Sequence, residues 1–226
     1  MHNSYGIVSM ANKCKHIVIY RKLIDARKKS KFCELQGQSL NKKVRRCGKI
    51  PANILMKLLD DCPVGEGSIY ENLVMDTIAL ILAGIIDSTL VRQQVPIEGG
   101  FCDIEFPICT EVINEYPLWE KWCAQYQVIS ILVEVKNKQK KATYEDVSQL
   151  EGYLSGGQLG HLGILASRSG FTKGALSSIS SYANKSVLIL PISHKDLKLL
   201  LELSMQNSLK VMTFLRRRGN LLLRLR

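Results

Sequence analysis

Glu134 and Lys136 stand two residues apart in the segment ILVEVKN (131–137). Side chains alternate between the two faces of a strand, so this acid and this base share one face while three apolar residues share the other. Burying a carboxylate and an ammonium group is costly unless they pair or act on a third charged group. The segment therefore predicts a strand whose charged face has a chemical use.

Further polar residues flank this strand. Asp103 follows a pair of glycines in a short extended run, and Glu71 lies on an apolar segment before it. Gln149 and Tyr153 come after the strand and stand one helical turn apart. Carboxylates beside an amine suit chemistry on a phosphate, because a hard cation held by carboxylates stabilises the negative charge that builds when water attacks.

The elements that must position these residues follow from hydrophobic periodicity. A strand over 128–137 precedes a helix over 143–154, in which Thr143 is the N-cap and Asp146 is the third helical residue. After it the pattern predicts strands over 161–167 and 186–192 and helices over 171–183 and 194–204. Alternating strands and helices predict parallel pairing through crossovers, and therefore an α/β protein with helices covering the sheet.

The earlier part of the chain predicts antiparallel structure. A buried helix is expected from Ser68, with Glu71 completing a capping box, and a hairpin over 95–108 turns at Gly99-Gly100. The segment 116–126 predicts a short helix or loop, and HIVIY (16–20) is compatible with one strand. The expected fold is thus a central mixed β-sheet flanked by helices.

In this order GGFCDIEF, VEVK and QLEGY resemble the motifs of the PD-(D/E)xK nuclease superfamily, which has the restriction-endonuclease-like fold. The Q-x-x-x-Y element resembles the RecB-like branch, and GILASRSGFTKGA (163–175) resembles the strand-to-helix junction of Mrr-like restriction endonucleases. The resemblance covers roughly residues 66–192. It implies a metal-dependent endonuclease acting on DNA, related to restriction or defence.

The resemblance also implies roles for single residues. Asp103, Glu134 and the carbonyl of Val135 would hold Mg²⁺, with Mn²⁺ as a substitute, and Lys136 would orient or deprotonate the attacking water. Three further residues complete the implied catalytic set, which consists of Asp103, Glu134, Lys136, Gln149, Tyr153 and Glu71. Two departures stand out: Cys102 replaces the usual proline before the aspartate, and residues 107–127 must loop out for Asp103 to reach Glu134.

Ordinary structural explanations exist for the same residues. Glu134 and Lys136 also fit a surface ion pair on an edge strand, and Glu71 also fits a helix cap without any catalytic role. Gln149 and Tyr153 are common on helix surfaces. A competing D-x-K triplet at 196–198 lies in a segment with helical periodicity, which argues against it as the catalytic motif.

The net charge of +11 lies entirely in the first fifth of the chain. Residues 1–50 hold thirteen of the 31 Lys and Arg but only two of the 20 Asp and Glu, so the remainder is balanced. Such a segment suits a polyanion, since neutralising phosphates releases condensed counterions. We therefore expect residues 1–50 to contact nucleic acid and 51–226 to form the nuclease-like domain, with expected phosphate contacts at Lys28, Lys29, Lys42, Lys43, Arg45, Arg46 and Lys173.

The basic segment also fits a solvated tail that promotes solubility, and Lys173 also fits a solvated helix start. Two further functions stay open: a non-catalytic nucleic-acid-binding module, and a protein-interaction subunit whose C-terminal FLRRRGNLLLRLR (214–226) adds a strand to a partner. Cutting both DNA strands with one site per chain favours a homodimer.

Seven scattered cysteines without a CxxC pair indicate reduced thiols and a cytoplasmic protein, and they give little support to a zinc site. The four histidines likewise lack the spacing of a metal site. No apolar run reaches the length of about 20 residues that a membrane-spanning helix needs. The longest, at 73–86, contains Asp76 and predicts a core helix.

Overall fold

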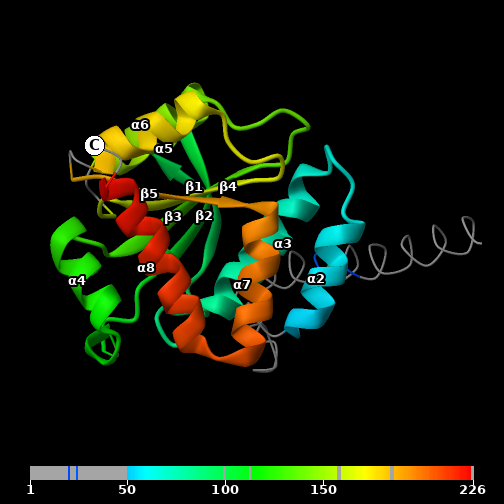
Figure 1. The fold of residues 1–226 in the computed structure, drawn as a ribbon, viewed down its shortest axis with the longest axis horizontal. Helices are drawn as coiled ribbons and strands as arrows, with labels where there is room; N and C mark the ends of the chain where they lie inside the picture. The colour runs from blue at the N-terminus through cyan, green and yellow to red at the C-terminus, as the bar shows by residue number, and fades with distance from the viewer. Residues whose placement is uncertain are drawn as a thin grey trace, which may run out of the picture.

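One mixed β-sheet forms the centre of the molecule in the computed structural model (Figure 1). The structure describes Tyr20, Ile24 and residues 50–98, 100–111, 113–156, 159–183 and 186–224. Within these residues the sheet has five strands in the order β1-β2-β3-β4-β5. They are β1 (Arg92–Ile97), β2 (Gly100–Pro107), β3 (Ser130–Lys136), β4 (Leu162–Ser167) and β5 (Leu188–Ser193).

The sheet changes from antiparallel to parallel at β3. β1 and β2 form a hairpin, β2 pairs antiparallel with β3, and β3, β4 and β5 run parallel. All six residues of β4 and the first five of β5 are buried, as expected for strands covered on both faces. The predicted α/β class, the mixed sheet and its flanking helices are confirmed.

Helices cover both faces of the sheet. They are α2 (Ala52–Asp61), α3 (Gly67–Ile81), α4 (Pro117–Tyr126), α5 (Tyr144–Ser155), α6 (Lys173–Ala183), α7 (His194–Gln206) and α8 (Ser208–Arg224), with a short 3-10 helix η1 (Ile113–Glu115). Figure 1 shows α5 and α6 together on one side of the sheet and α2, α3 and α7 together on the other. Because α5 and α6 connect successive parallel strands, they lie on the same face.

Helix starts show which capping predictions were right. The box at the start of α5 is confirmed, since the Asp146 carboxylate accepts from the Thr143 N–H at 2.9 Å. The box predicted for Ser68 and Glu71 is wrong, because α3 begins one residue earlier, at Gly67. Gly65, with φ of 92°, turns the chain before the helix, so Ser68 is already inside it and its carbonyl accepts from Asn72 Nδ2 at 2.7 Å.

The C-terminal segment is a helix, so the prediction that it supplies an added strand is wrong. Val211 and Leu215, four residues apart, are buried against the rest of the protein. This helical spacing places apolar side chains on one face, whereas the alternation of Leu and Arg near the end of the chain suggested a strand. α2 was not predicted from the sequence.

The core also includes residues from the basic segment. Tyr20 and Ile24 are buried in helical backbone, and the Tyr20 hydroxyl donates to Asp76 Oδ2 at 2.8 Å. The strand expected over 16–20 is therefore wrong at Tyr20, and its other residues lie outside the described part. The core helix expected at 73–86 is confirmed as far as Ile81, where α3 ends, and is wrong over 82–86, where the chain turns at Gly84 with φ of 89°. No described helix is both long and apolar enough to cross a membrane.

Candidate active site

Asp103 and Glu134 lie side by side on neighbouring strands. Ile104 pairs with Val133 in the antiparallel register, which continues to place Asp103 across from Glu134. Asp103 Oδ2 accepts from the Val135 N–H at 2.7 Å. The intervening residues leave the sheet to form η1 and α4, so the chain between β2 and β3 loops out as the resemblance requires.

Glu134 carries an unsatisfied oxygen at this position. Its exposed fraction is 4%, and Oε1 accepts from Lys136 Nζ at 2.8 Å. Oε2 is buried and has no hydrogen-bonding partner in the described part of the protein. A buried carboxylate oxygen without a donor is costly, so it marks a place where a bound cation or water would be stabilised.

Proximity and burial shift the protonation of both acids. Burial raises the pKa of Asp103, and the N–H of Val135 and the charge of Lys136 partly offset this rise. Burial also raises the pKa of Glu134, and the negative charge of Asp103 raises it further. Burial lowers the pKa of Lys136, but the Glu134 carboxylate outweighs it, so this pKa lies above its ordinary value. The two carboxylates thus need a positive partner, and Lys136 is charged at neutral pH.

Lys136 continues into a chain of side-chain contacts on α5. Its Nζ donates to Gln149 Oε1 at 3.1 Å, and Gln149 Nε2 donates to the Tyr153 hydroxyl at 2.7 Å. Asp146 Oδ1 lies 3.6 Å from the same Nζ. The structure therefore brings Gln149 directly to the amine and Tyr153 behind it, while Asp146 is a neighbour that was expected only as a cap.

The Tyr153 hydroxyl also packs against the β1–β2 hairpin. Gly100 has φ of 151°, and a Cβ atom there would lie 3.2 Å from the hydroxyl oxygen. A side chain at this position would crowd the phenol, so glycine lets the hairpin approach α5.

Gln94 was missed by sequence reasoning. The register of the β1–β2 hairpin places it across from Asp103, and its Nε2 lies 3.4 Å from Asp103 Oδ1, a long and weak hydrogen bond. Its φ is 51°, a left-handed conformation that is uncommon for a residue other than glycine. An exposed Gln in an edge strand gives no signal of this in the sequence.

The oxygen atoms at this site suit a hard cation. The N–H of Val135 is directed at Asp103, and in a strand the carbonyl of the same residue lies on the same edge, so it faces the same side. The described residues contain no cluster of three or more His, Cys, Asp or Glu side chains able to hold a metal. Asp103, Glu134 and the Val135 carbonyl would therefore act with water, which fits Mg²⁺ because it keeps several waters and binds through one or two carboxylates.

Glu71 and Lys173, the two other predicted site residues in the described part, lie on α3 and α6. Glu71 is half-buried on α3, and its Oε1 lies 3.8 Å from where a Cβ of Gly67 would be, at the start of the same helix. Its catalytic role stays a prediction. Lys173 is exposed at the first residue of α6. The other expected phosphate contacts lie outside the described residues: Lys28, Lys29, Lys42, Lys43, Arg45 and Arg46.

Cys102, which replaces the usual proline, is not a nucleophile here. Its thiol is buried, and its Sγ lies 3.4 Å from the Val133 carbonyl oxygen. Burial and the neighbouring Glu134 raise its pKa to about 12, so the thiol stays protonated at neutral pH. The four cysteines in the described part of the chain are free.

Glu105 on β2 is another buried acid, but its charge is already balanced. Arg92 Nε donates to its Oε2 at 2.7 Å, and Ser130 Oγ donates to its Oε1 at 2.8 Å. Both oxygens have donors, in contrast to Glu134. We therefore assign Glu105 to the stability of the sheet.

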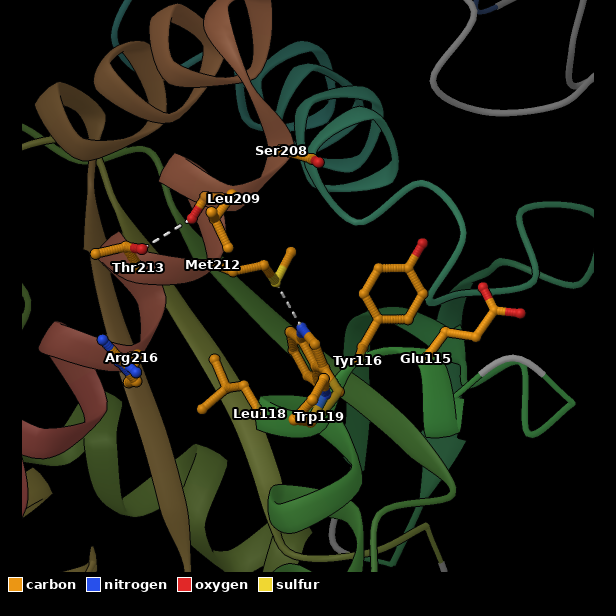
Figure 2. A pocket seen from close by; sticks show the side chains of 10 residues that line it. Glu115, Tyr116, Leu118, Trp119, Ser208, Leu209, Met212, Thr213 and Arg216 are labelled. Atoms are coloured by element: carbon orange, nitrogen blue, oxygen red, sulfur yellow. Dashed lines mark hydrogen bonds between the residues drawn. The ribbon is translucent and has the colours of Figure 1, made fainter.

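A separate groove of about 560 Å³ runs between α4 and α8 (Figure 2). Figure 2 shows Tyr116, Trp119 and Met212 gathered along it, with Trp119 Nε1 lying 3.1 Å from Met212 Sδ. Its lining includes a single carboxylate, that of Glu115, and no paired acids. The groove thus offers no second acid to pair with Glu115, so we place the candidate site at the carboxylate pair on β2 and β3.

Comparison with protein-family models, with curated proteins and with solved structures finds no match to this chain.

Proposed function

We propose that the protein is a metal-dependent nuclease that hydrolyses DNA phosphodiester bonds at Asp103, Glu134 and Lys136. The observation that carries the proposal is the buried, unpartnered Oε2 of Glu134 beside the Asp103 carboxylate. A surface ion pair would leave neither a buried orphan oxygen nor two adjacent acids with raised pKa values. Ionisable groups with shifted pKa values that gather in one place are typical of functional sites.

The chain's own groups divide the work. Asp103, Glu134 and the Val135 carbonyl would hold Mg²⁺, which supplies charge stabilisation at the phosphate and a water of lowered pKa. Lys136, held by Glu134 and Gln149, presents a positive charge that orients the attacking water and offsets charge on the phosphate. Gln149 and Tyr153 keep that amine in place, since neither is a good ligand for a hard cation.

DNA as the substrate is supported by the charge of the chain. The whole excess of positive charge lies in residues 1–50, where it would meet the phosphate backbone. The sheet is mixed, and Asp103 and Glu134 lie where the pairing between β2 and β3 ends. This arrangement supports a restriction-endonuclease-like fold of the Mrr-like or RecB-like kind. Cutting both strands would take two copies of the chain, so we include a homodimer in the proposal.

Nicking of supercoiled plasmid tests the proposal directly. We expect cleavage with Mg²⁺ or Mn²⁺ and none with EDTA. Asp103→Asn, Glu134→Gln and Lys136→Met should each reduce cleavage by at least about 100-fold while DNA binding persists, because affinity comes mainly from phosphate contacts elsewhere.

Matched controls use the same chemical changes at exposed positions. Glu202→Gln and Lys195→Met on α7 remove the same charges away from the site and should leave cleavage at the wild-type rate. A wild-type protein that binds DNA and never cuts it would favour the non-catalytic binding module instead.

A further inference from the structure

Arg168 lies at the same end of the sheet as the candidate active site, and no acid of the described residues pairs with it. It directly follows β4, and its side chain makes no hydrogen bond or ion pair with any other residue in the described ranges. Its Nη1 is buried and has no acceptor. A buried arginine nitrogen without an acceptor is costly, so its place beside a candidate active site favours an acceptor that the described residues do not supply.

The Tyr70 ring holds the guanidinium in place, and His194 supports that ring from α7. Its Cζ lies 5.4 Å from the centroid of the buried Tyr70 ring, and Tyr70 stacks on His194 at 5.9 Å with an interplanar angle of 24°. The Tyr70 oxygen and His194 Nδ1 are 3.3 Å apart. Cation–π contact of this kind holds a guanidinium over an aromatic face while leaving its edge able to bind an anion.

The rings add no charge that would neutralise Arg168. Burial raises the pKa of Tyr70, so the phenol keeps its proton. Burial and the Arg168 charge lower the pKa of His194, so its ring is neutral at pH 7. Asp60 lies 4.0 Å from His194 Nε2 and is paired with Lys198 Nζ at 2.8 Å. The positive charge of Arg168 therefore stays available.

Arg168 is also a direct neighbour of the residue that carries the catalytic amine. Its backbone N–H donates to the Lys136 carbonyl at 3.0 Å, and the parallel register pairs Lys136 with Ser167. Lys136 faces α5, whereas Arg168 contacts Tyr70 on α3, so the two cations flank the end of the sheet from opposite faces. A nucleic-acid strand that crosses this end of the sheet would meet both Lys136 and Arg168.

We propose that Arg168, seated on the Tyr70 ring, binds a second backbone phosphate of the nucleic acid, next to the one that is hydrolysed. This inference rests on the proposed function and adds a positioning contact to it. A guanidinium suits the task because it bonds two phosphate oxygens at once and fixes the direction of the strand across the site.

The test measures binding without cleavage. Fluorescence anisotropy of a labelled DNA duplex in EDTA, across a series of salt concentrations, is compared for the wild type, Arg168→Met and Arg168→Lys. We expect Arg168→Met to weaken binding about tenfold, as removal of a charged hydrogen bond does, and to lower the slope of log affinity against log salt by about 0.9, as expected when one phosphate is no longer neutralised. Arg168→Lys keeps the charge and should keep the slope.

Arg217→Met is the matched control, since Arg217 is exposed on α8 and the substitution removes the same charge. Thermal unfolding shows whether each variant is folded, and Arg168→Lys keeps the test usable if the Met variant is not. Equal slopes for Arg168→Met and wild type, or a slope lowered in Arg168→Lys as well, would overturn the phosphate contact.

Failure of this inference is distinguishable from failure of the proposed function. A protein that nicks plasmid with Mg²⁺ but has an unchanged slope in Arg168→Met is a nuclease without this contact. A protein that never cuts DNA but has a lowered slope on substitution of Arg168 has the phosphate contact without the nuclease activity. Absence of DNA binding by the wild type at low salt would overturn both.

Discussion

We expect Asp103 to lower the stability of the metal-free protein, because its carboxylate is partly buried at the site. Burial raises its pKa, so the folded state holds the proton more tightly than the unfolded state, whose pKa is about 3.9. Stability therefore falls as the pH rises from about 4 through the raised pKa, because the folded form must then carry a buried charge. Asparagine keeps an oxygen for the Val135 N–H and has no charge to bury.

We thus expect Asp103→Asn in EDTA to be more stable than wild type at pH 7.5 and to lose less stability between pH 5 and 7.5. Urea unfolding at both pH values measures this. Mn²⁺ should raise the melting temperature of the wild type and have little effect on the variant, since binding to the folded state alone stabilises it. An equally steep pH dependence in both proteins would contradict the assignment, and Glu202→Gln is the exposed control.

Substitution of Gln94 can separate the effect of backbone strain from an effect on cleavage, because Gln127 has the same left-handed backbone conformation away from the site. Gln94 has φ of 51° next to Asp103, and Gln127 has φ of 50° at the C-cap of α4. Glycine adopts this conformation without a steric cost, so Gln94→Gly and Gln127→Gly should each gain about 0.5–1 kcal/mol of stability.

Only the change at Gln94 also removes an amide from the Asp103 carboxylate. We expect Gln94→Gly to slow Mg²⁺-dependent nicking about tenfold, at the lower end of the effect of losing a group that orients a ligand. Gln127→Gly should cut at the wild-type rate. Equal cleavage by the two variants would show that Gln94 is strained for a structural reason alone.

The packing of α8 on α4 depends on one glycine. A Cβ atom at Gly219 would lie 2.8 Å from the Trp122 ring, which is buried, so alanine forces a shift in a rigid side chain. A Cβ atom at Gly174 in α6 would have no other atom within 4 Å. Gly174→Ala should therefore gain up to about 1 kcal/mol from helix propensity, whereas Gly219→Ala should lose about 1–3 kcal/mol through overpacking. Thermal melts of the pair compare them, and a stabilised Gly219→Ala would contradict this contact between the helices.

The charge of the whole molecule should determine how it meets DNA. Deleting residues 1–50 would remove Tyr20 and Ile24 from the core, so substitution within the segment is the better test. Replacing Lys42, Lys43, Arg45 and Arg46 with Gln should weaken binding to duplexes of any sequence and flatten its salt dependence, by about 0.9 for each phosphate that is no longer neutralised. Anisotropy across a salt series measures this, with an unchanged melting temperature as the control. An unchanged slope would mean that these four residues do not touch the phosphates.

Sequence patterns alone predicted the elements that depend on neighbouring residues. Alternation over ILVEVKN predicted β3 with Glu134 and Lys136 on one face, and Thr143 with Asp146 predicted the start of α5. Turns, caps and hydrophobic periods arise from residues within a few positions of one another, so they are visible in the sequence. The same local reasoning failed for Ser68, where a turn at Gly65 moved the helix start, and for the C-terminal helix, where burial of one face decided the conformation.

Only the tertiary structure decided which side chains meet. The register that sets Asp103 against Glu134, the unpartnered oxygen of Glu134 and the left-handed backbone of Gln94 depend on how strands pair across a looped-out insert. The contact of Arg168 with Tyr70, and of Tyr70 with His194, joins the end of one strand to helices on one face of the sheet. These features come from residues distant in the chain, and their free energies depend on burial and pairing that exist only once the sheet and its two helical layers have assembled.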